Sequence, residues 1–221
     1  MPKMSERYAI VPAGVVGGDP VDVVYKATAV GQDDSFVAID FETADCLPDS
    51  ACSVALVHVV GDRIIDRMHR LIRPPRPRFE FTYIHGITWQ NVRDAPTFAT
   101  VWSELAPFAS RGRFLAAHNA SFDRRVLHAC CRMSGIDIPG IPFLCTVTLS
   151  RRTWDLPSHR LDVVCRHLGI DLNHHQALSD AQACARIVLH ARQANPAVML
   201  QVLARARLSH AKVQPQARRE R

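Results

Sequence analysis

The clearest pattern in the chain is a continuous apolar run at residues 36–39, which is typical of a strand buried on both faces. The apolar-rich segments 54–60 and 63–72 flank Gly61 and Asp62, a pair that favours a hairpin turn. The pattern therefore predicts three neighbouring strands that are joined in chain order.

Helical periods and short apolar runs alternate after these strands. We expect short strands at 114–117 and 143–145, helices at 97–106, 120–133, 160–168 and 179–193, and a terminal helix from Pro196. Pro107 is expected to end the first helix, and Ser179 with Gln182 fits a capping box that opens the fourth. This order predicts one α/β domain with a mixed sheet covered by helices.

The two ends of the chain differ from its middle. Residues 1–35 are punctuated by glycine and proline and hold one short candidate strand at 21–25, so we expect an N-terminal extension. Arginine is frequent at residues 201–221, where we expect a basic C-terminal tail. The predicted domain occupies residues 36–200.

Composition limits the class of protein. With 221 residues, 48% of them apolar, the chain can bury a sizeable core, which excludes disorder throughout. The formal net charge of +6 favours polyanionic partners. Six arginines between residues 63 and 78 concentrate positive charge inside the predicted domain.

Cysteine usage and hydropathy bear on the compartment. The seven cysteines include no CxxC pair, which indicates a reducing environment. No apolar run reaches the roughly 18–20 residues that a membrane span needs. We therefore expect a cytoplasmic protein with no membrane partner.

Four acidic residues fall where the pattern predicts burial. Asp40 and Glu42 end the first strand and, at a period of two, share one of its faces. Asp123 and Asp180 extend the apolar stripes of their helices. Burying an unpaired carboxylate costs on the order of several kcal/mol, so these groups either retain a proton or bind cations.

Divalent cations would explain the four acids together. Oxygen ligands favour Mg²⁺ or Mn²⁺, and two such ions about 3.5–4 Å apart can stabilise both oxygens of a phosphodiester displacement. His175 lies in the loop before the fourth helix, and an imidazole there suits a general base near neutral pH. Taken singly, the same residues also fit a solvated strand end, acids that complement helix dipoles, and a surface histidine.

Three segments carry a family resemblance. Residues 36–44 (FVAIDFETA), 118–123 (HNASFD) and 175–181 (HQALSDA) resemble the motifs of the DEDDh, or DnaQ-like, 3′→5′ exonucleases. Residues 85–88 (HGIT) resemble a further segment of these enzymes. The resemblance implies a ribonuclease H-like fold, which is a mixed five-stranded sheet flanked by helices.

The resemblance also implies roles for individual residues. Asp40, Glu42, Asp123 and Asp180 match the ligands of two divalent cations, Mg²⁺ or Mn²⁺, and His175 matches the general base. In the family, a metal-bound water attacks the terminal phosphodiester and releases nucleoside monophosphates from a 3′ end.

The resemblance further places substrate-binding residues around the terminal nucleotide. These are Phe41, Thr43, His85, His118, Asn119 and Phe122. Phe122 equally suits core packing, Asn119 suits a helix cap, and Gly86 beside His85 suits a turn.

The expected substrate is the 3′ end of single-stranded DNA. An exoribonuclease is the nearest alternative, because discrimination by the 2′-hydroxyl is not visible in the motifs. A polymerase-associated proofreading or accessory module is another, although Gln201 does not begin a clear clamp-binding segment. We expect the arginines of residues 63–78 to contact nucleic acid more readily than the tail.

Overall fold

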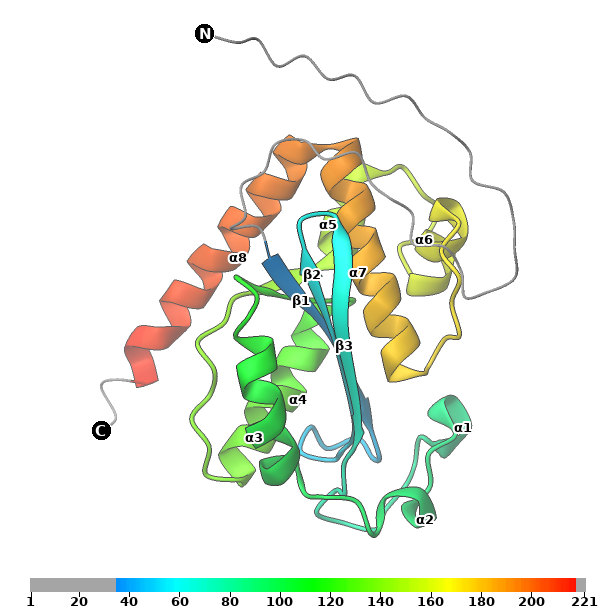
Figure 1. Cartoon of the computed structure of the whole chain (residues 1–221), viewed down its shortest axis with the longest axis vertical. Coiled ribbons are helices and arrows are strands. Elements are labelled where there is room, and N and C mark those ends of the chain that lie inside the picture. Colours follow the sequence, from blue (N-terminus) through cyan, green and yellow to red (C-terminus); the bar gives the residue numbers. More distant parts are fainter. Residues whose placement is uncertain (1–34, 218–221) are drawn as a thin grey trace, which may run out of the picture.

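The computed structural model describes the backbone of residues 35–217 and the side chains of residues 35–208. The expected extension and its candidate strand at 21–25 therefore lie, apart from Ser35, outside the described residues. Five strands form one sheet in the order β3-β2-β1-β4-β5 (Figure 1). They are β1 (Ser35–Thr43), β2 (Ala51–Val60), β3 (Arg63–Leu71), β4 (Leu115–Ala117) and β5 (Phe143–Cys145).

Strand β1 lies at the centre of the sheet. It pairs antiparallel with β2 and parallel with β4, while β3 and β5 complete the two edges. The turn between β2 and β3 contains Gly61 at a φ of 60°, a conformation that glycine adopts without steric cost. The mixed five-stranded sheet and the predicted hairpin are both confirmed.

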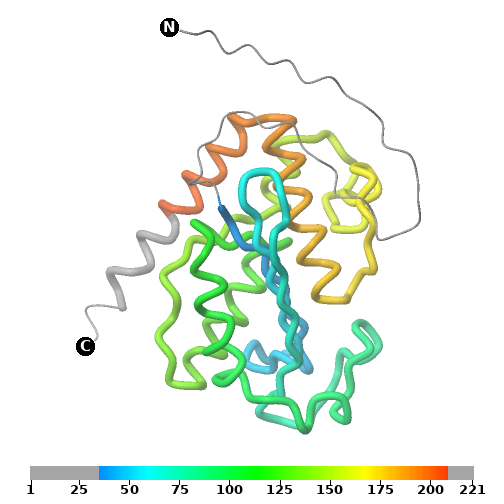
Figure 2. Tube along the Cα trace, viewed as in Figure 1, coloured from blue at the N-terminus to red at the C-terminus, as the bar shows by residue number. Residues whose placement is uncertain are grey.

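Helices cover both faces of the sheet. The helices of the described residues are α1 (Thr82–His85), α2 (Trp89–Val92), α3 (Phe98–Ala109), α4 (Ala120–Met133), α5 (Thr146–Thr153), α6 (Leu161–Leu168), α7 (Ala177–Ala194) and α8 (Pro196–Ala217), of which the short α1 and α2 lie beyond one end of the sheet (Figure 1). Helices α3 and α4 lie on one side of β1, and α7 lies on the other (Figures 1 and 2). No helix in this described part of the chain is long and apolar enough to cross a membrane.

The alternation of β1 divides its residues between two cores. The odd-numbered residues from Val37 to Phe41 pack with α3 and α4, and the even-numbered apolar residues pack with α7 and α8. Asp40 and Glu42 continue the even-numbered set, so the pleat directs both carboxylates to the side of α7.

Gly112 sets the distance between the loop after α3 and the central strand. A Cβ at this position would lie 2.6 Å from the backbone nitrogen of Val37, closer than atoms can approach. Only glycine allows this contact. It holds the start of β4 beside β1, and β4 leads directly into the segment 118–123.

Two predicted helix ends were wrong. Helix α3 continues through Pro107 to Ala109, because Phe108 and Ala109 are buried in the core and offset the lost backbone hydrogen bond. Helix α7 begins at Ala177, not after Ser179 as the capping box implied. The Ser179 hydroxyl instead accepts the Asn173 N–H at 2.8 Å.

Two further elements differ from the sequence pattern. Helix α5 was not predicted, because its threonine and valine residues lower helix propensity. Its buried Leu149 and Ser150 anchor it in the core. Helix α8 runs continuously through residue 201, with Val202 buried, so no break in secondary structure separates a tail at that point.

Candidate active site

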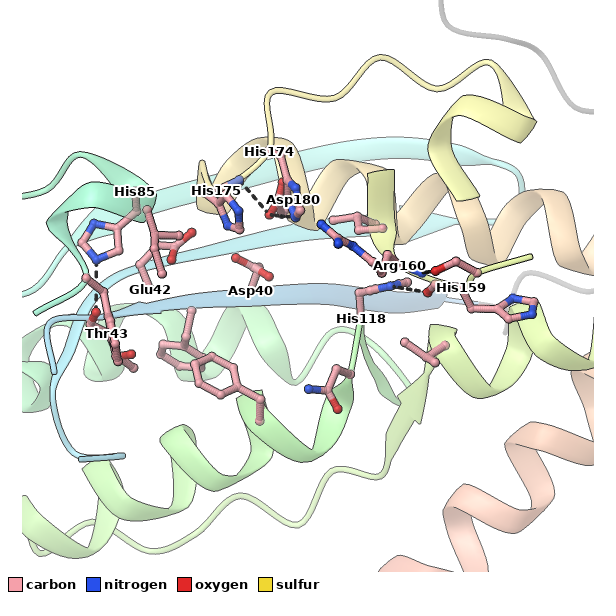
Figure 3. A pocket seen from close by; sticks show the side chains of 18 of the residues that line it. Asp40, Glu42, Thr43, His85, His118, His159, Arg160, His174, His175 and Asp180 are labelled. Carbon is pink, nitrogen blue, oxygen red and sulfur yellow. Dashed lines mark hydrogen bonds and ion pairs between the residues drawn. The ribbon is translucent and has the colours of Figure 1, made fainter. Parts of the chain in front are cut away.

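A cleft of about 710 Å³ opens at the C-terminal end of β1. Its walls come from β1, the segment around α1, the start of α4, and the loops that lead into α6 and α7 (Figure 3). Ten of the eleven expected site residues line it, namely Asp40, Phe41, Glu42, Thr43, His85, His118, Asn119, Phe122, His175 and Asp180. The eleventh, Asp123, is buried and bonded to the backbone of the cleft wall.

Three carboxylates converge in this cleft. Oxygen atoms of Asp40, Glu42 and Asp180 all lie within 4.8 Å of one another. Asp40 and Glu42 come from β1, and Asp180 comes from the first turn of α7, whose Ala181 and Cys184 pack beneath the sheet. The packing of α7 on β1 thus forces the three negative groups together.

Asp123 reaches the same strand from α4. Its side chain is 1% exposed, and its Oδ1 accepts the backbone N–H of Phe41 at 3.1 Å. Phe41 lies between Asp40 and Glu42, so this hydrogen bond places the fourth carboxylate beside the other three.

Burial raises the pKa of all four acids, and repulsion from neighbouring carboxylates adds to the effect at Asp40, Glu42 and Asp123. The pKa of Asp40 is well above its ordinary value, first because of burial and then because of Asp123, Asp180 and Glu42. Burial, followed by repulsion from Asp180 and Asp123, raises the pKa of Glu42 to about 8. Burial is also the main cause that raises the pKa values of Asp123 and Asp180 to about 7. The site is therefore short of positive charge.

The chain supplies little compensation for these charges. Within residues 35–208, the nearest basic group is His174, whose Nε2 lies 3.8 Å from Asp180 Oδ2. Burial lowers the pKa of His174, which favours its neutral form. Asp180 Oδ1 is buried and has no hydrogen-bond partner among the described residues. An orphaned carboxylate oxygen in an all-oxygen cluster fits a hard divalent cation.

His175 lies exposed at the mouth of the cleft, next to Asp180. Its backbone has a φ of 68°, which is uncommon for a residue with a side chain. This conformation turns its N–H toward Asp180 Oδ2, at 3.1 Å, and its ring stacks on that of His174 with 3.8 Å between ring centroids. The loop therefore holds the imidazole beside the acid cluster.

His118 is fixed as a neutral imidazole. Its Nε2 donates to the backbone carbonyl of His159 at 3.0 Å, and its Nδ1 accepts the Thr146 hydroxyl at 2.9 Å. Burial lowers the pKa of His118 to about 4. Both ring nitrogens are thus engaged by the protein, so His118 shapes the wall of the cleft.

His85 ties α1 to the end of β1. Its Nδ1 accepts the Ile87 N–H at 3.0 Å, and its Nε2 donates to the carbonyl of Thr43 at 3.1 Å. Gly86 ends α1 in the left-handed conformation at a φ of 75°. Gly86 thus forms the expected turn, and this turn is also what places His85 in the cleft.

Asn119 and Phe122 form the wall that α4 contributes. Asn119 occupies the N-cap position at a φ of 67°, but its side chain makes no capping hydrogen bond to the helix. Its Oδ1 instead accepts the Ser121 hydroxyl at 3.0 Å. Phe122 packs partly against the core and also faces the cleft. Phe122 therefore contributes both to core packing and to the wall of the cleft.

Comparisons with known proteins agree with this geometry. A family model described as "Exonuclease" matches residues 37–188. The chain is 33% identical over 162 residues to the DNA polymerase III PolC-type of Thermotoga maritima, a match that covers 71% of this chain and 12% of the polymerase. The chain belongs to the DnaQ-like 3′→5′ exonuclease family.

Solved structures share the fold of this DnaQ-like exonuclease. Exonuclease X in complex with 5′ overhanging duplex DNA aligns with a TM-score of 0.63 and 27% identity, covering 76% of this chain and 96% of that one. The nuclease domain of 3′hExo, a DEDDh family member bound to rAMP, aligns with a TM-score of 0.65 at 20% identity, with the same coverages. The ribonuclease H-like fold is confirmed.

Sequence reasoning missed several residues of the exonuclease cleft. His174, Arg151, His159 and Arg160 also line it. His174 is adjacent in sequence to His175, and this position was the one signal that could have indicated it. Arg151 lies in α5, which was not predicted, and His159 lies in the loop after it, so the sequence pattern gave no basis for placing either residue. Arg160 begins the helix predicted at 160–168, but nothing in the sequence indicated that this helix starts at the cleft.

Proposed function

We propose that this chain is a divalent-cation-dependent 3′→5′ exonuclease that releases nucleoside monophosphates from single-stranded DNA. The observation that carries the proposal is the convergence of Asp40, Glu42 and Asp180 within 4.8 Å, with Asp123 joined to the same strand. Four such groups have raised pKa values and no described cationic partner besides His174. A positively charged cofactor is the simplest account of their assembly.

Asp40, Glu42, Asp123 and Asp180 would hold two Mg²⁺ or Mn²⁺ ions. When bound, two such ions supply positive charge that stabilises the attacking and leaving oxygens of a phosphodiester displacement. The protein contributes the fixed positions of the carboxylates. The pleat of β1, the first turn of α7 and the hydrogen bond from Phe41 to Asp123 provide them.

His175 would accept the proton of the attacking water. The residue lines the cleft, and its backbone N–H bond to Asp180 keeps it beside the acid cluster, where the reacting phosphate would bind. His175 is exposed, so an accepted proton can pass on to solvent. The neighbouring neutral His118 is unsuited to this role, because the protein engages both of its ring nitrogens.

The remaining expected residues would hold the terminal nucleotide. Phe122 offers a ring face, while Thr43 and Phe41 present the backbone of β1 to the cleft. His85 and His118 would act by fixing the walls, and Asn119 by its polar side chain. The cleft has the volume of a small-ligand site, so a splayed single strand suits it.

Digestion of end-labelled oligonucleotides tests the proposal. Matched DNA and RNA strands labelled at the 5′ or 3′ end would be incubated with Mg²⁺, Mn²⁺ or EDTA. A 5′-labelled DNA strand should shorten stepwise with either metal and stay intact in EDTA. Faster loss of RNA would favour the exoribonuclease alternative, and endonucleolytic fragments would contradict the proposal.

Association with a DNA polymerase is a second candidate. The chain spans only 12% of the length of the PolC-type polymerases it matches, so it corresponds to one segment of those proteins. Gel filtration of the chain with a replicative polymerase from the same source would test a proofreading role. Separate elution at micromolar concentrations of both would contradict it.

A further inference from the structure

A second hollow, of about 560 Å³, lies along α4 beside the catalytic cleft. It is lined by Asn119, Ser121, Phe122, Arg124, Arg125, His128 and Arg132. No acidic residue is among the residues that line it. The exposed side of α4 that forms this hollow therefore carries a net positive charge.

The helical period explains why these residues share one surface. Arg124, His128 and Arg132 are four residues apart, which places them in one row along α4, and Arg125 lies next to the first. At a rise of 1.5 Å per residue, the row from Arg124 to Arg132 extends about 12 Å. All three arginines are exposed.

The arginines of α4 differ from many others in the chain. Within residues 35–208, no hydrogen bond or ion pair of the Arg124, Arg125 or Arg132 guanidinium group is found. By contrast, Arg70 pairs with Glu104, and Arg76 pairs with Asp45 and Asp49. Half of the arginine block at 63–78 is thus neutralised internally, since Arg78 also pairs, with Glu80.

The basic hollow is continuous with the catalytic cleft. Asn119 and Phe122 line both, so one strand could pass from the acid cluster over these residues and onto α4. The left-handed Asn119 at the start of the helix forms the corner between the two.

We propose that Arg124, Arg125 and Arg132 bind the phosphates of the single strand on the 5′ side of the scissile bond. This proposal rests on the proposed exonuclease function and adds the path of the substrate. A row of about 12 Å matches three to four stacked nucleotides, at about 3.4 Å each along a strand. Exposed guanidinium groups without acidic partners are ready to exchange counterions for phosphate.

Strand binding in EDTA tests the path separately from cleavage. The variant R124A/R125A/R132A would be compared with the wild-type chain by fluorescence anisotropy, using a 12-nucleotide single strand at 50–200 mM salt. Each lost phosphate contact lowers the slope of log affinity against log salt by about 0.7, so the triple variant should lose about 2. Its affinity at 50 mM salt should fall by roughly tenfold or more.

Two further variants serve as controls. R63A/R67A removes exposed arginines from the first half of the edge strand β3, and it should lower affinity and slope less than R124A/R125A/R132A does, because neither residue lines the cleft or the hollow. R124K/R125K/R132K keeps the charges and should restore most of the slope. A wild-type slope in the alanine triple variant, or equal losses in the β3 control, would overturn the proposed path.

Cleavage assays complete the test. The loss of kcat/KM in the alanine triple variant should grow with strand length, from less than about twofold on a dinucleotide to roughly tenfold or more on a 12-mer. An equal loss at every length would overturn the path. A chain that binds strands in EDTA yet cleaves none with Mn²⁺ would instead contradict the proposed exonuclease function alone.

Discussion

The backbone N–H of Phe41 donates a hydrogen bond to Oδ1 of Asp123 at 3.1 Å, although the two residues are 82 positions apart. The bond joins the first turn of α4 to the central strand at the point between Asp40 and Glu42. It makes Asp123 both a candidate metal ligand and a structural partner of β1. These two roles can be separated by mutation.

Asp123→Asn and Asp123→Ala should differ in stability and agree in activity. Asparagine keeps an oxygen that accepts the Phe41 N–H, whereas alanine leaves this buried donor unsatisfied at a cost of about 1–3 kcal/mol. Both variants remove a carboxylate, so both should lose cleavage. Urea denaturation would give the free energies of unfolding. Equal stabilities would contradict the structural role, and full activity of Asp123→Asn would contradict the ligand role.

Asp40→Asn should stabilise the metal-free chain while it abolishes cleavage. Burial and three neighbouring acids raise the pKa of Asp40, so its charge is unfavourable without a cation. A neutral amide of the same shape should raise the free energy of unfolding in EDTA at pH 8 by about 1–3 kcal/mol. Turnover should fall at least about 100-fold. A destabilised Asp40→Asn variant would contradict the account of charge repulsion.

The stability of the metal-free chain should fall as pH rises from 6.5 to 8.5. Glu42 has a pKa of about 8 in the folded state, above its ordinary value near 4.5, so the folded chain binds more protons than the unfolded chain. Histidines do not cause this decrease. In the folded chain, buried histidines such as His118, whose pKa is lowered, are already neutral below pH 6.5. In the unfolded chain, histidines lose their protons near pH 6.5, at the start of the window.

Thermal unfolding in EDTA across this window measures the effect. The free energy of unfolding should decrease by about 1–3 kcal/mol, and Glu42→Gln should flatten the decrease. Mn²⁺ should stabilise the wild-type chain more at pH 8.5 than at pH 6.5, since cations compete with protons for the same oxygens. If the free energy of unfolding decreases as steeply with pH in Glu42→Gln as in the wild-type chain, Glu42 is not the group that titrates, and the prediction is wrong.

His175→Ala should lose rate without losing metal. General-base catalysis contributes typically 100- to 10,000-fold, so kcat should fall by about that factor, while residual activity rises with pH as hydroxide becomes available. Mn²⁺ affinity should change little, because the contact of His175 with Asp180 is through its backbone. His174→Ala is the matched control. A larger rate loss in His174→Ala than in His175→Ala would contradict the role of His175 and indicate that His174 is the general base.

Much of the fold was predictable because local pattern and tertiary packing agree. The boundaries of α4 and β5 match their sequence patterns, since strong apolar stripes or turns define both ends. The helix ends predicted at Pro107 and Ser179 were wrong for one reason. Local rules for helix ends were outweighed by the burial of Phe108 and by the contact between Asn173 and Ser179.

The candidate site was predictable at the level of residues but not of contacts. Period-two spacing placed Asp40 and Glu42 on one face, and helical spacing turned Asp180 toward the core. Nothing in the sequence indicated that Phe41 would bond to Asp123, or that Thr146 would engage His118. Such bonds join residues far apart in the chain, and only the packed structure determines them.

Titration of the chain with Mn²⁺ by calorimetry tests the central claim, that the four carboxylates assemble to bind cations. The wild-type chain should bind Mn²⁺ at pH 8 and release protons, and binding should be lost or severely weakened in both Asp40→Asn and Asp180→Asn. No binding by the wild-type chain, or unchanged binding by both variants, would contradict the claim.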